Sequence, residues 1–352
     1  MDDLDVHILR ELTQANNVNP ARPGFRASYR SVARALGVAP GTARNRINRM
    51  YASGVITGSS VYANPNLLGL EVAAYAVEVA HGRRKKEVVD HLRALDGMFF
   101  IQDFRGSLLG LAFVSADASA REATLQAIHR ITGAEGGVLS RVEYPPCALT
   151  LLPSEWKMVS RLMRGSFSTY AALARELGAS VRSIKRRVSK LVNGRAILSV
   201  PTMDYRSLAG CVPVDLVVAF TSPAARPEAE RKVLGLVEDR MIFAGPWSAF
   251  GLYSLLLPKV STANQIAEDV GRIPGVALHR VEIVDEHIDQ VRALQPYVDR
   301  QCTPDPRRPI AAKRGHGAGP RATEARPPRP VRRVPSRRVT PGGRRRRGSG
   351  SR

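Results

Sequence analysis

A basic, helix-patterned segment occurs twice in this chain. Residues 29–50 read YRSVARALGVAPGTARNRINRM and residues 170–191 read YAALARELGASVRSIKRRVSKL, and the two segments align without a gap. Each contains two stretches with helical apolar spacing joined through a glycine, a pattern that predicts two short helices connected by a sharp turn.

In the first copy, Ser28 is expected to cap the first helix, Gly37 to end it and Pro40 to begin the second. The apolar positions predict an inner face made of Val32, Ala33, Leu36, Ala43, Ile47 and Met50. The opposite side of the second helix is polar and basic, as in units that read the DNA major groove. The residues predicted to contact DNA are Gly41, Thr42, Arg44, Asn45, Asn48 and Arg49.

The second copy follows the same plan, with Thr169 in the place of Ser28, Gly178 at the turn and Ser180 as the cap of the second helix. The predicted inner face consists of Leu173, Ala174, Leu177, Ile184, Val188 and Leu191. The residues predicted to contact DNA are Arg182, Ser183, Lys185, Arg186, Ser189 and Lys190. The two copies therefore agree in their inward residues and differ in their outward ones.

Charged helix faces are commonly no more than solvated surfaces, and this is the alternative interpretation of both copies. Their shared context favours DNA. Each is preceded by an amphipathic segment (4–14 and 153–163) and followed by a short apolar stretch (54–63 and 195–204), which we interpret as a strand or wing. No aromatic stripe accompanies the arginines, which favours double-stranded over single-stranded DNA.

A second pattern, in the order strand, helix, strand, strand, helix, strand, also occurs twice, over residues 72–145 and 214–284. This order is the ferredoxin-like arrangement. The predicted fold class is α+β, with two winged helix-turn-helix domains alternating with two ferredoxin-like domains. The predicted domains span residues 1–63, 64–148, 149–203 and 204–300, and an Arg/Pro-rich tail over 301–352 is predicted to be disordered.

The net charge of +22 is uneven along the chain. Residues 303–352 carry +14, from sixteen Lys and Arg against two carboxylates, and the rest carries +8. A basic protein of this kind is expected to bind a polyanion, most often nucleic acid. No signal peptide or membrane-spanning stretch is evident, and the three distant cysteines (Cys147, Cys211 and Cys302) fit no metal spacing, so we expect a cytoplasmic, nucleoid-associated protein with no metal or cofactor.

The ordered series of motifs resembles the Lrp/AsnC family of transcription regulators. The series consists of LDVHILREL, SVARALGVAPGTARNRINRMYASGVI and NPNLLGL in the first half, and LVNGRAI and SLAGCV in the second. The resemblance covers residues 2–298 and implies a winged helix-turn-helix joined to a ferredoxin-like domain that senses a small molecule and dimerises. Family members usually have one of each, so this chain is expected to be a fused tandem pair that forms dimers or larger homo-oligomers.

Four features depart from the family pattern. The connection over residues 16–26 is longer than usual, Ala39 stands where a capping serine is common, and Arg195 replaces the glycine found at Gly54. The hairpins FRGSLLG and GPWSAFG both lack the acidic residue that usually follows the glycine. An amino-acid effector is therefore not expected, and we assign no effector residues.

Three functions compete at this stage. A DNA-binding regulator without enzymatic activity, built as a covalent pseudo-dimer, accounts for both basic helices. A siroheme-decarboxylase-like enzyme is the first alternative, because those enzymes resemble Lrp/AsnC proteins; however, the two central hairpins lack histidine, and we expect the scattered His81, His91, His129, His279 and His287 not to cluster with a carboxylate or thiol. A sensing and assembly module that no longer binds DNA is the second alternative.

Overall fold

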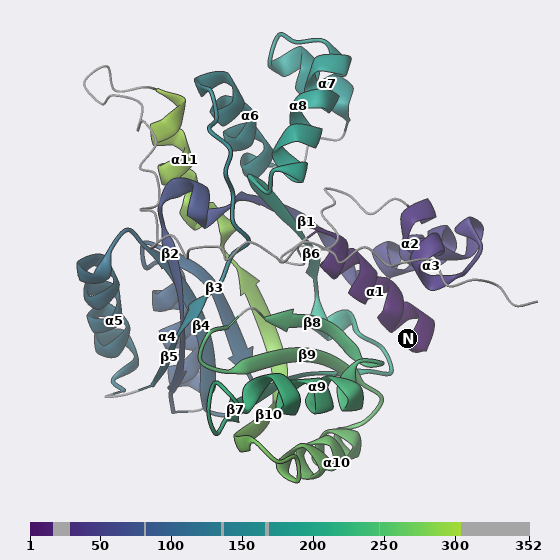
Figure 1. The fold of residues 1–352 in the computed structure, drawn as a ribbon. Helices are drawn as coiled ribbons and strands as arrows, with labels where there is room; N and C mark the ends of the chain where they lie inside the picture. Colours follow the sequence, from purple (N-terminus) through teal and green to yellow (C-terminus); the bar gives the residue numbers. More distant parts are fainter. Residues whose placement is uncertain (17–28, 81, 135–136, 166–168, 246, 304–352) are drawn as a thin grey trace, which may run out of the picture. The chain divides into compact units, whose positions relative to one another are not determined.

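The computed structural model describes residues 1–303, except 17–28, 81, 135–136, 166–168 and 246. The expected cap at Ser28, the long connection over 16–26 beyond residue 16, and the tail from residue 304 onward lie outside the described residues. Figure 1 shows the helices and strands that follow. Within the described residues, no helix is both long and apolar enough to cross a membrane.

The elements fall into four consecutive groups (Figure 1). The first group is α1 (Asp3–Asn16), α2 (Tyr29–Leu36), α3 (Pro40–Ala52), β1 (Ile56–Ala63) and the 3₁₀ turn η1 (Pro65–Leu68). The second is β2 (Glu71–Glu78), α4 (Arg83–Arg93), β3 (Met98–Phe104), β4 (Leu108–Ser115), α5 (Ala118–Thr132) and β5 (Val138–Val142). The third is α6 (Pro153–Arg164), α7 (Tyr170–Glu176), α8 (Val181–Asn193), β6 (Ile197–Met203) and η2 (Tyr205–Ser207). The fourth is β7 (Val212–Phe220), α9 (Arg226–Val237), β8 (Met241–Gly245), β9 (Gly251–Leu257), α10 (Val260–Gly271), β10 (Val276–Asp289), η3 (Val291–Leu294) and α11 (Gln295–Cys302).

The strands of the second and fourth groups form one eight-stranded sheet in the order β5-β2-β4-β3-β10-β7-β9-β8. Within each half the last strand lies beside the first, so both halves have the same internal strand order. The halves are joined where β3 pairs antiparallel with β10, with Ile101 opposite Ile288. At the far ends of the sheet, Val142 and Trp247 form an isolated bridge, so the two outer strands approach each other and the sheet curls around its inner face.

Helices cover the outer face of the curled sheet. Successive residues of each strand point to opposite faces, and those that point to the outer face are mostly large and apolar. In the first half, Val77, Leu111 and Phe113 pack with apolar residues of α4 and α5 in one buried cluster. In the second half, Val214, Leu216 and Val218 pack with α9 and α10 in another. The alternate residues of the same strands point to the inner face, which the helices do not cover.

Strands β1 and β6 pair with each other and form a two-stranded antiparallel ribbon, from Ile56 opposite Met203 to Ala63 opposite Ile197. The stretches 54–63 and 195–204, interpreted from the sequence as a strand or wing, thus each form one strand, and the partner of each is the equivalent strand of the other half. Each unit supplies only one strand, and a lone strand leaves its backbone N–H and C=O groups unpaired. The equivalent strand from the other half of the chain supplies the missing partners.

The helical groups are each held by elements from elsewhere in the chain. The apolar face of α1 shares a buried cluster with Ile242 of β8 and Leu256 of β9. The apolar face of α6 shares one with β1 of the first half and with α11, and Ser160 of α6 donates to the Asp299 carboxylate at 2.7 Å. Neither helical group is therefore an independent appendage of the sheet.

Equivalent turns connect the helical groups to the ribbon strands, and both require a left-handed backbone. Gly54 has φ +78° and its counterpart Arg195 has φ 56°, the one non-glycine residue with positive φ in the described chain. A side chain in this conformation costs about 1 to 2 kcal/mol. The family-typical glycine is thus explained at Gly54, and Arg195 carries backbone strain.

We expect Gly54→Ala to lower the free energy of unfolding by about 1 to 2 kcal/mol, because the new Cβ meets the left-handed penalty. It also lies 3.3 Å from Ser207 Oγ. The control is Gly58→Ala in β1, where the Cβ makes ordinary contact with Thr202 at 3.6 Å and φ is not positive. Urea denaturation of both variants checks this. Equal effects at the two positions would contradict the assignment of the cost to backbone conformation.

Candidate nucleic-acid interface

The helices α2 and α3 meet at the predicted sharp turn. Gly37 has φ +65° and its Cβ position is open, so the backbone conformation alone explains the glycine. Five of the six predicted inner residues are buried and Leu36 is half-buried; the buried ones are Val32, Ala33, Ala43, Ile47 and Met50. They share a cluster with Val6, Ile8 and Leu9 of α1.

All six residues predicted on the outer side of α3 are exposed, namely Gly41, Thr42, Arg44, Asn45, Asn48 and Arg49. Tyr29 of α2 donates to Asn48 Oδ1 at 3.2 Å, which positions that amide at the edge of the surface. The helix begins at Pro40 after Ala39, which provides no side-chain cap. The first N–H groups of α3 therefore keep their donors for water or for an anion such as phosphate.

The helices α7 and α8 repeat this geometry. Gly178 has φ +60°, Thr169 accepts from the Ala172 N–H at 3.1 Å, and Ser180 accepts from the Ser183 N–H at 3.2 Å, as the sequence predicts. Five of the six outer residues are exposed and Ser183 is half-buried; the exposed ones are Arg182, Lys185, Arg186, Ser189 and Lys190. The Lys185 ammonium lies 5.9 Å from the Tyr170 ring centroid, so this tyrosine, like Tyr29, supports the outer face.

Arg49 and Lys190 occupy equivalent positions and both form ion pairs inside their own unit. Arg49 lies 2.8 Å from the Asp5 carboxylate and Lys190 lies 2.7 Å from the Glu155 carboxylate. Each carboxylate is the third residue of the first helix of its unit, and each is buried. Burial raises the pKa of Glu155, but the bonds from Lys190 and the Leu152 N–H outweigh this and the pKa lies below its usual value.

These two ion pairs fasten the third helix of each unit to the first. Arg46, which was not among the predicted residues, reinforces one of them by contacting Asp2 at 2.6 Å and Asp5 at 3.0 Å. The signal was present in the sequence as an acidic residue in the first turn of both leading helices. The alignment of the two repeats does not show this signal, because the number of residues between the leading helix and the repeated segment differs between the two units. Outside these ion pairs, Arg44 remains as an exposed basic residue of the first outer face, and Arg182, Lys185 and Arg186 remain on the second.

Two helix-turn-helix units on a curled β-sheet place the chain in the class of mixed α+β proteins with helix-turn-helix domains. Residues 1–51 match the AsnC-type helix-turn-helix domain. The first 51 residues therefore carry an AsnC-type helix-turn-helix domain, and in this part the chain is similar to Lrp/AsnC regulators.

Two relatives illustrate the likeness in sequence. The HTH-type transcriptional regulator Ptr1 of Methanocaldococcus jannaschii is 36% identical over 96 residues, which are 27% of this chain and 59% of the relative. The regulatory protein AsnC of Haemophilus influenzae is 30% identical over 97 residues, again 27% and 59%. The chain thus matches about three-fifths of the length of these relatives.

A solved structure, that of the siroheme decarboxylase NirDL in complex with an iron-uroporphyrin III analogue, resembles the whole fold. The TM-score is 0.50 at 16% identity, over 85% of this chain and 98% of that one. At this identity the likeness concerns the fold alone.

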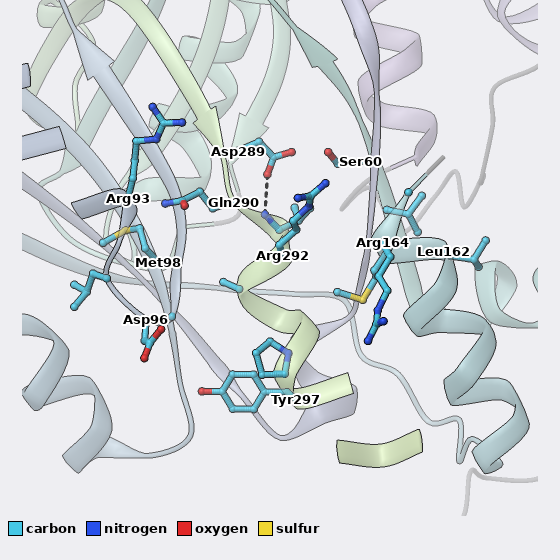
Figure 2. A pocket seen from close by; sticks show the side chains of 18 of the residues that line it. Ser60, Arg93, Asp96, Met98, Leu162, Arg164, Asp289, Gln290, Arg292 and Tyr297 are labelled. Carbon is cyan, nitrogen blue, oxygen red and sulfur yellow. Dashed lines mark hydrogen bonds between the residues drawn. The ribbon is translucent and has the colours of Figure 1, made fainter. Parts of the chain in front are cut away.

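The structure also contains two hollows. Figure 2 shows the first, a pocket of about 850 Å³ where residues at the ends of α4 and α6 meet β1, η3 and α11. Its basic residues include Arg164, which is 2.5 Å from Asp299, and Arg300, which lies over the Tyr297 ring at 4.6 Å. These two cations are therefore already engaged by the protein.

The second hollow is a cavity of about 630 Å³ on the inner face of the curled sheet, lined by β2, β3, β4, β7, β9 and β10 and by the ribbon strand β6. Two polar residues of its wall, Gln102 of β3 and His287 of β10, hydrogen bond to each other. The expectation that His287 clusters with no carboxylate is wrong, because Asp215 and Asp289 line the same cavity. Among the described residues, no group of three or more His, Cys, Asp and Glu side chains could hold a metal ion.

Asp215 of β7 is the most unusual group in this wall. It is 3% exposed, its Oδ1 has no hydrogen-bond partner among the described residues, and burial raises its pKa to about 7 while a bond with Ser254 lowers it. A single Asp in VDLVVAF is typical of an outward-facing residue of a strand, so the sequence does not predict its burial. Its burial follows from the curling of the sheet.

We expect the stability of the chain to depend on Asp215 between pH 5 and pH 8. The folded state binds the Asp215 proton more tightly than the unfolded chain does, so the free energy of unfolding of the wild type falls as the pH rises toward 7. The side chain in Asp215→Asn does not titrate. The stability of Asp215→Asn relative to wild type should therefore increase by about 2 to 3 kcal/mol from pH 5 to pH 8. Urea denaturation at both pH values measures this, with the exposed Asp285→Asn as the control. A difference that does not change with pH would contradict the buried state of Asp215.

Proposed function

We propose that the chain is a sequence-specific transcription regulator that binds double-stranded DNA through α3 and α8. One observation carries the proposal: in both helices the predicted inner positions are buried, while the polar and basic positions face outward. This is the arrangement by which the second helix of such units reads the major groove. Arg44 and Arg186 suit guanine edges and phosphates, and Asn45 suits adenine.

The two units act as a covalent pseudo-dimer in this proposal, a tandem pair of helix-turn-helix units alternating with two ferredoxin-like domains. The β1–β6 ribbon and the β3–β10 pairing support it, because both join equivalent parts of the two halves. A symmetric dimer reads a palindrome. Here Asn45 aligns with Arg186 and Asn48 aligns with Ser189 in the sequence, so the two half-sites of the DNA are expected to differ.

The remaining parts of the proposal follow the resemblance. The ferredoxin-like halves sense a small molecule and associate into larger homo-oligomers, the chain catalyses no reaction, and it acts in the cytoplasm on the nucleoid. The relatives named as transcription regulators support this assignment.

A siroheme-decarboxylase-like enzyme is the second candidate, favoured by the fold likeness over 85% of the chain. A porphyrin with many carboxylates needs cations around it. The cavity wall instead contains Glu78, Asp215 and Asp289, and its Arg280 is paired with Glu78 at 3.1 Å and with Glu282 at 2.6 Å. Absorbance of the purified protein after incubation with siroheme distinguishes the candidates: a stable porphyrin spectrum would favour the enzyme.

We expect Arg44→Ala and Arg186→Ala each to weaken specific DNA binding by about 5- to 150-fold, since a base-contacting arginine contributes about 1 to 3 kcal/mol. The DNA is a sequence selected by the wild-type protein from a random pool, and affinity is measured by fluorescence anisotropy. Footprinting should show that each variant loses protection over a different half-site.

The matched control is Arg83→Ala on α4, which also removes one positive charge from a side chain that is 94% exposed. It should change affinity by less than about 2-fold, as expected for a charge outside the interface. If Arg44→Ala and Arg186→Ala bind as tightly as this control, the helices do not contact DNA, and the sensing and assembly module becomes the better assignment.

We expect deletion of residues 303–352, which carry +14, to weaken DNA binding equally for specific and random sequences and to reduce its salt dependence. Lysines and arginines that neutralise phosphates act without reading bases. Titrations at several salt concentrations with both kinds of DNA check this, and an unchanged slope of affinity against salt would exclude the tail as a DNA-binding arm. The preferred sequence should stay the same.

A further inference from the structure

The cavity inside the curled sheet is apolar and partly aromatic. Trp247 stacks on Phe250 at 5.6 Å between ring centroids, and Phe100 meets Trp247 edge-on at 6.2 Å. Leu278 also lines the cavity. It is 63% exposed, although its strand β10 lies in the middle of the sheet. The volume of the cavity, about 630 Å³, lies in the range of small-molecule sites. Open apolar surface of this kind costs free energy unless something covers it.

Two buried polar groups in this wall lack partners among the described residues. The Oδ1 atom of Asp215 accepts no hydrogen bond, and the indole N–H of Trp247, a residue 6% exposed, donates none. Buried polar groups are nearly always hydrogen-bonded in folded proteins, and the unpaired oxygen of a buried carboxylate is the costlier of the two. A ligand that supplies a donor to Asp215 would remove that cost.

The charge of the wall indicates which donor fits. The carboxylates of Glu78 and Glu282 already engage Arg280, which leaves Asp215 without a cation. Enclosure in the fold lowers the pKa of His287, although Asp289 raises it, so this ring does not supply the charge at pH 8. Burial raises the pKa of Tyr205, which lines the same cavity, and the Asp215 carboxylate raises it further, so this ring is neutral at pH 8. The cavity is therefore complementary to a cation.

We propose that the cavity is a binding site for an amphiphilic amine, a molecule with an aromatic or other apolar body and one protonated nitrogen. The apolar body covers Leu278 and the aromatic cluster, and the nitrogen donates to Asp215. Aromatic rings around a desolvated cation add further attraction. The wall is thus matched to a cationic ligand and mismatched to a polycarboxylate.

The occupant would also touch the ribbon that links the two helix-turn-helix units. Residues 200–203 of β6 and Tyr62 of β1 line the same cavity. A ligand that binds one arrangement of the ribbon more tightly than another shifts the population toward that arrangement. The arrangement of α3 and α8 changes with it. As a regulatory site this rests on the proposed DNA-binding function; as a binding site it does not.

Isothermal titration calorimetry at pH 8 without DNA tests the site with three naphthalene probes of similar size. The probes are 2-(2-naphthyl)ethylamine, 2-(2-naphthyl)ethanol and 3-(2-naphthyl)propanoate, which are cationic, neutral and anionic. The amine should bind one molecule per chain at least about 10-fold more tightly than the alcohol, as expected for a charge-assisted hydrogen bond in place of a neutral one. The propanoate should bind most weakly. Absence of amine binding, or equal affinity of amine and alcohol, would overturn the proposal.

Three variants locate the binding. Asp215→Asn should lose the preference for amine over alcohol, and circular dichroism verifies that it folds. Leu278→Trp, which fills the cavity, should weaken all three probes, whereas Leu236→Trp changes a leucine of α9 that is 47% exposed and outside the cavity, and should change none. A retained preference in Asp215→Asn would place the amine elsewhere. The Arg44→Ala variant should bind the amine like wild type, so failure of DNA binding and failure of this site are separate results.

Discussion

Backbone pairing between the two halves of the chain is the constraint on which the rest of this structure depends. It occurs at two places, where β3 meets β10 and where β1 meets β6. The first joins two four-stranded halves into one sheet, and the second ties together the strands that follow the two helix-turn-helix units. Hydrogen bonds of this kind are obligatory for buried strands. Each half is therefore incomplete without the other, which explains why equivalent elements recur in one chain.

The curl of the sheet is a direct consequence of this pairing. Twisted strands accumulate rotation across a wide sheet, and here eight strands bring Val142 near Trp247. The outer face is covered by four helices, and the inner face encloses the cavity that contains Asp215. The same pairing places the ribbon over the cavity, so the helix-turn-helix units and the cavity share residues of β6.

Much of the local structure could be predicted from the sequence, because it depends on local chemistry. The two turn glycines, the caps at Thr169 and Ser180 and the inner faces of α3 and α8 follow from helical spacing and backbone preference. The order of strands and helices follows from the same periodicities. The pairing of the two strands that follow the helical units could not be predicted, because a strand's partner is set by tertiary contacts and nothing in GVITGSSVYA identifies residues 197–203 as its complement.

The candidate site shows the same division. The outward positions of α3 and α8 could be listed from the pattern alone, whereas the roles of Arg49 and Lys190 could not. Their partners Asp5 and Glu155 lie on helices that precede the repeated segment by connections of different length, so no alignment brings them together. The cavity could not be predicted from the sequence either. Asp215 and His287 lie on separate strands and line the same cavity only because the sheet curls.

The intramolecular ribbon has a consequence for how the protein behaves at low abundance. A regulator assembled from separate subunits loses its paired form on dilution, and its subunits can exchange with those of related proteins. In this chain the equivalent pairing is first-order, with an effective concentration set by the polypeptide itself. The two helix-turn-helix units thus stay paired at any cellular copy number, because pairing within one chain does not depend on concentration.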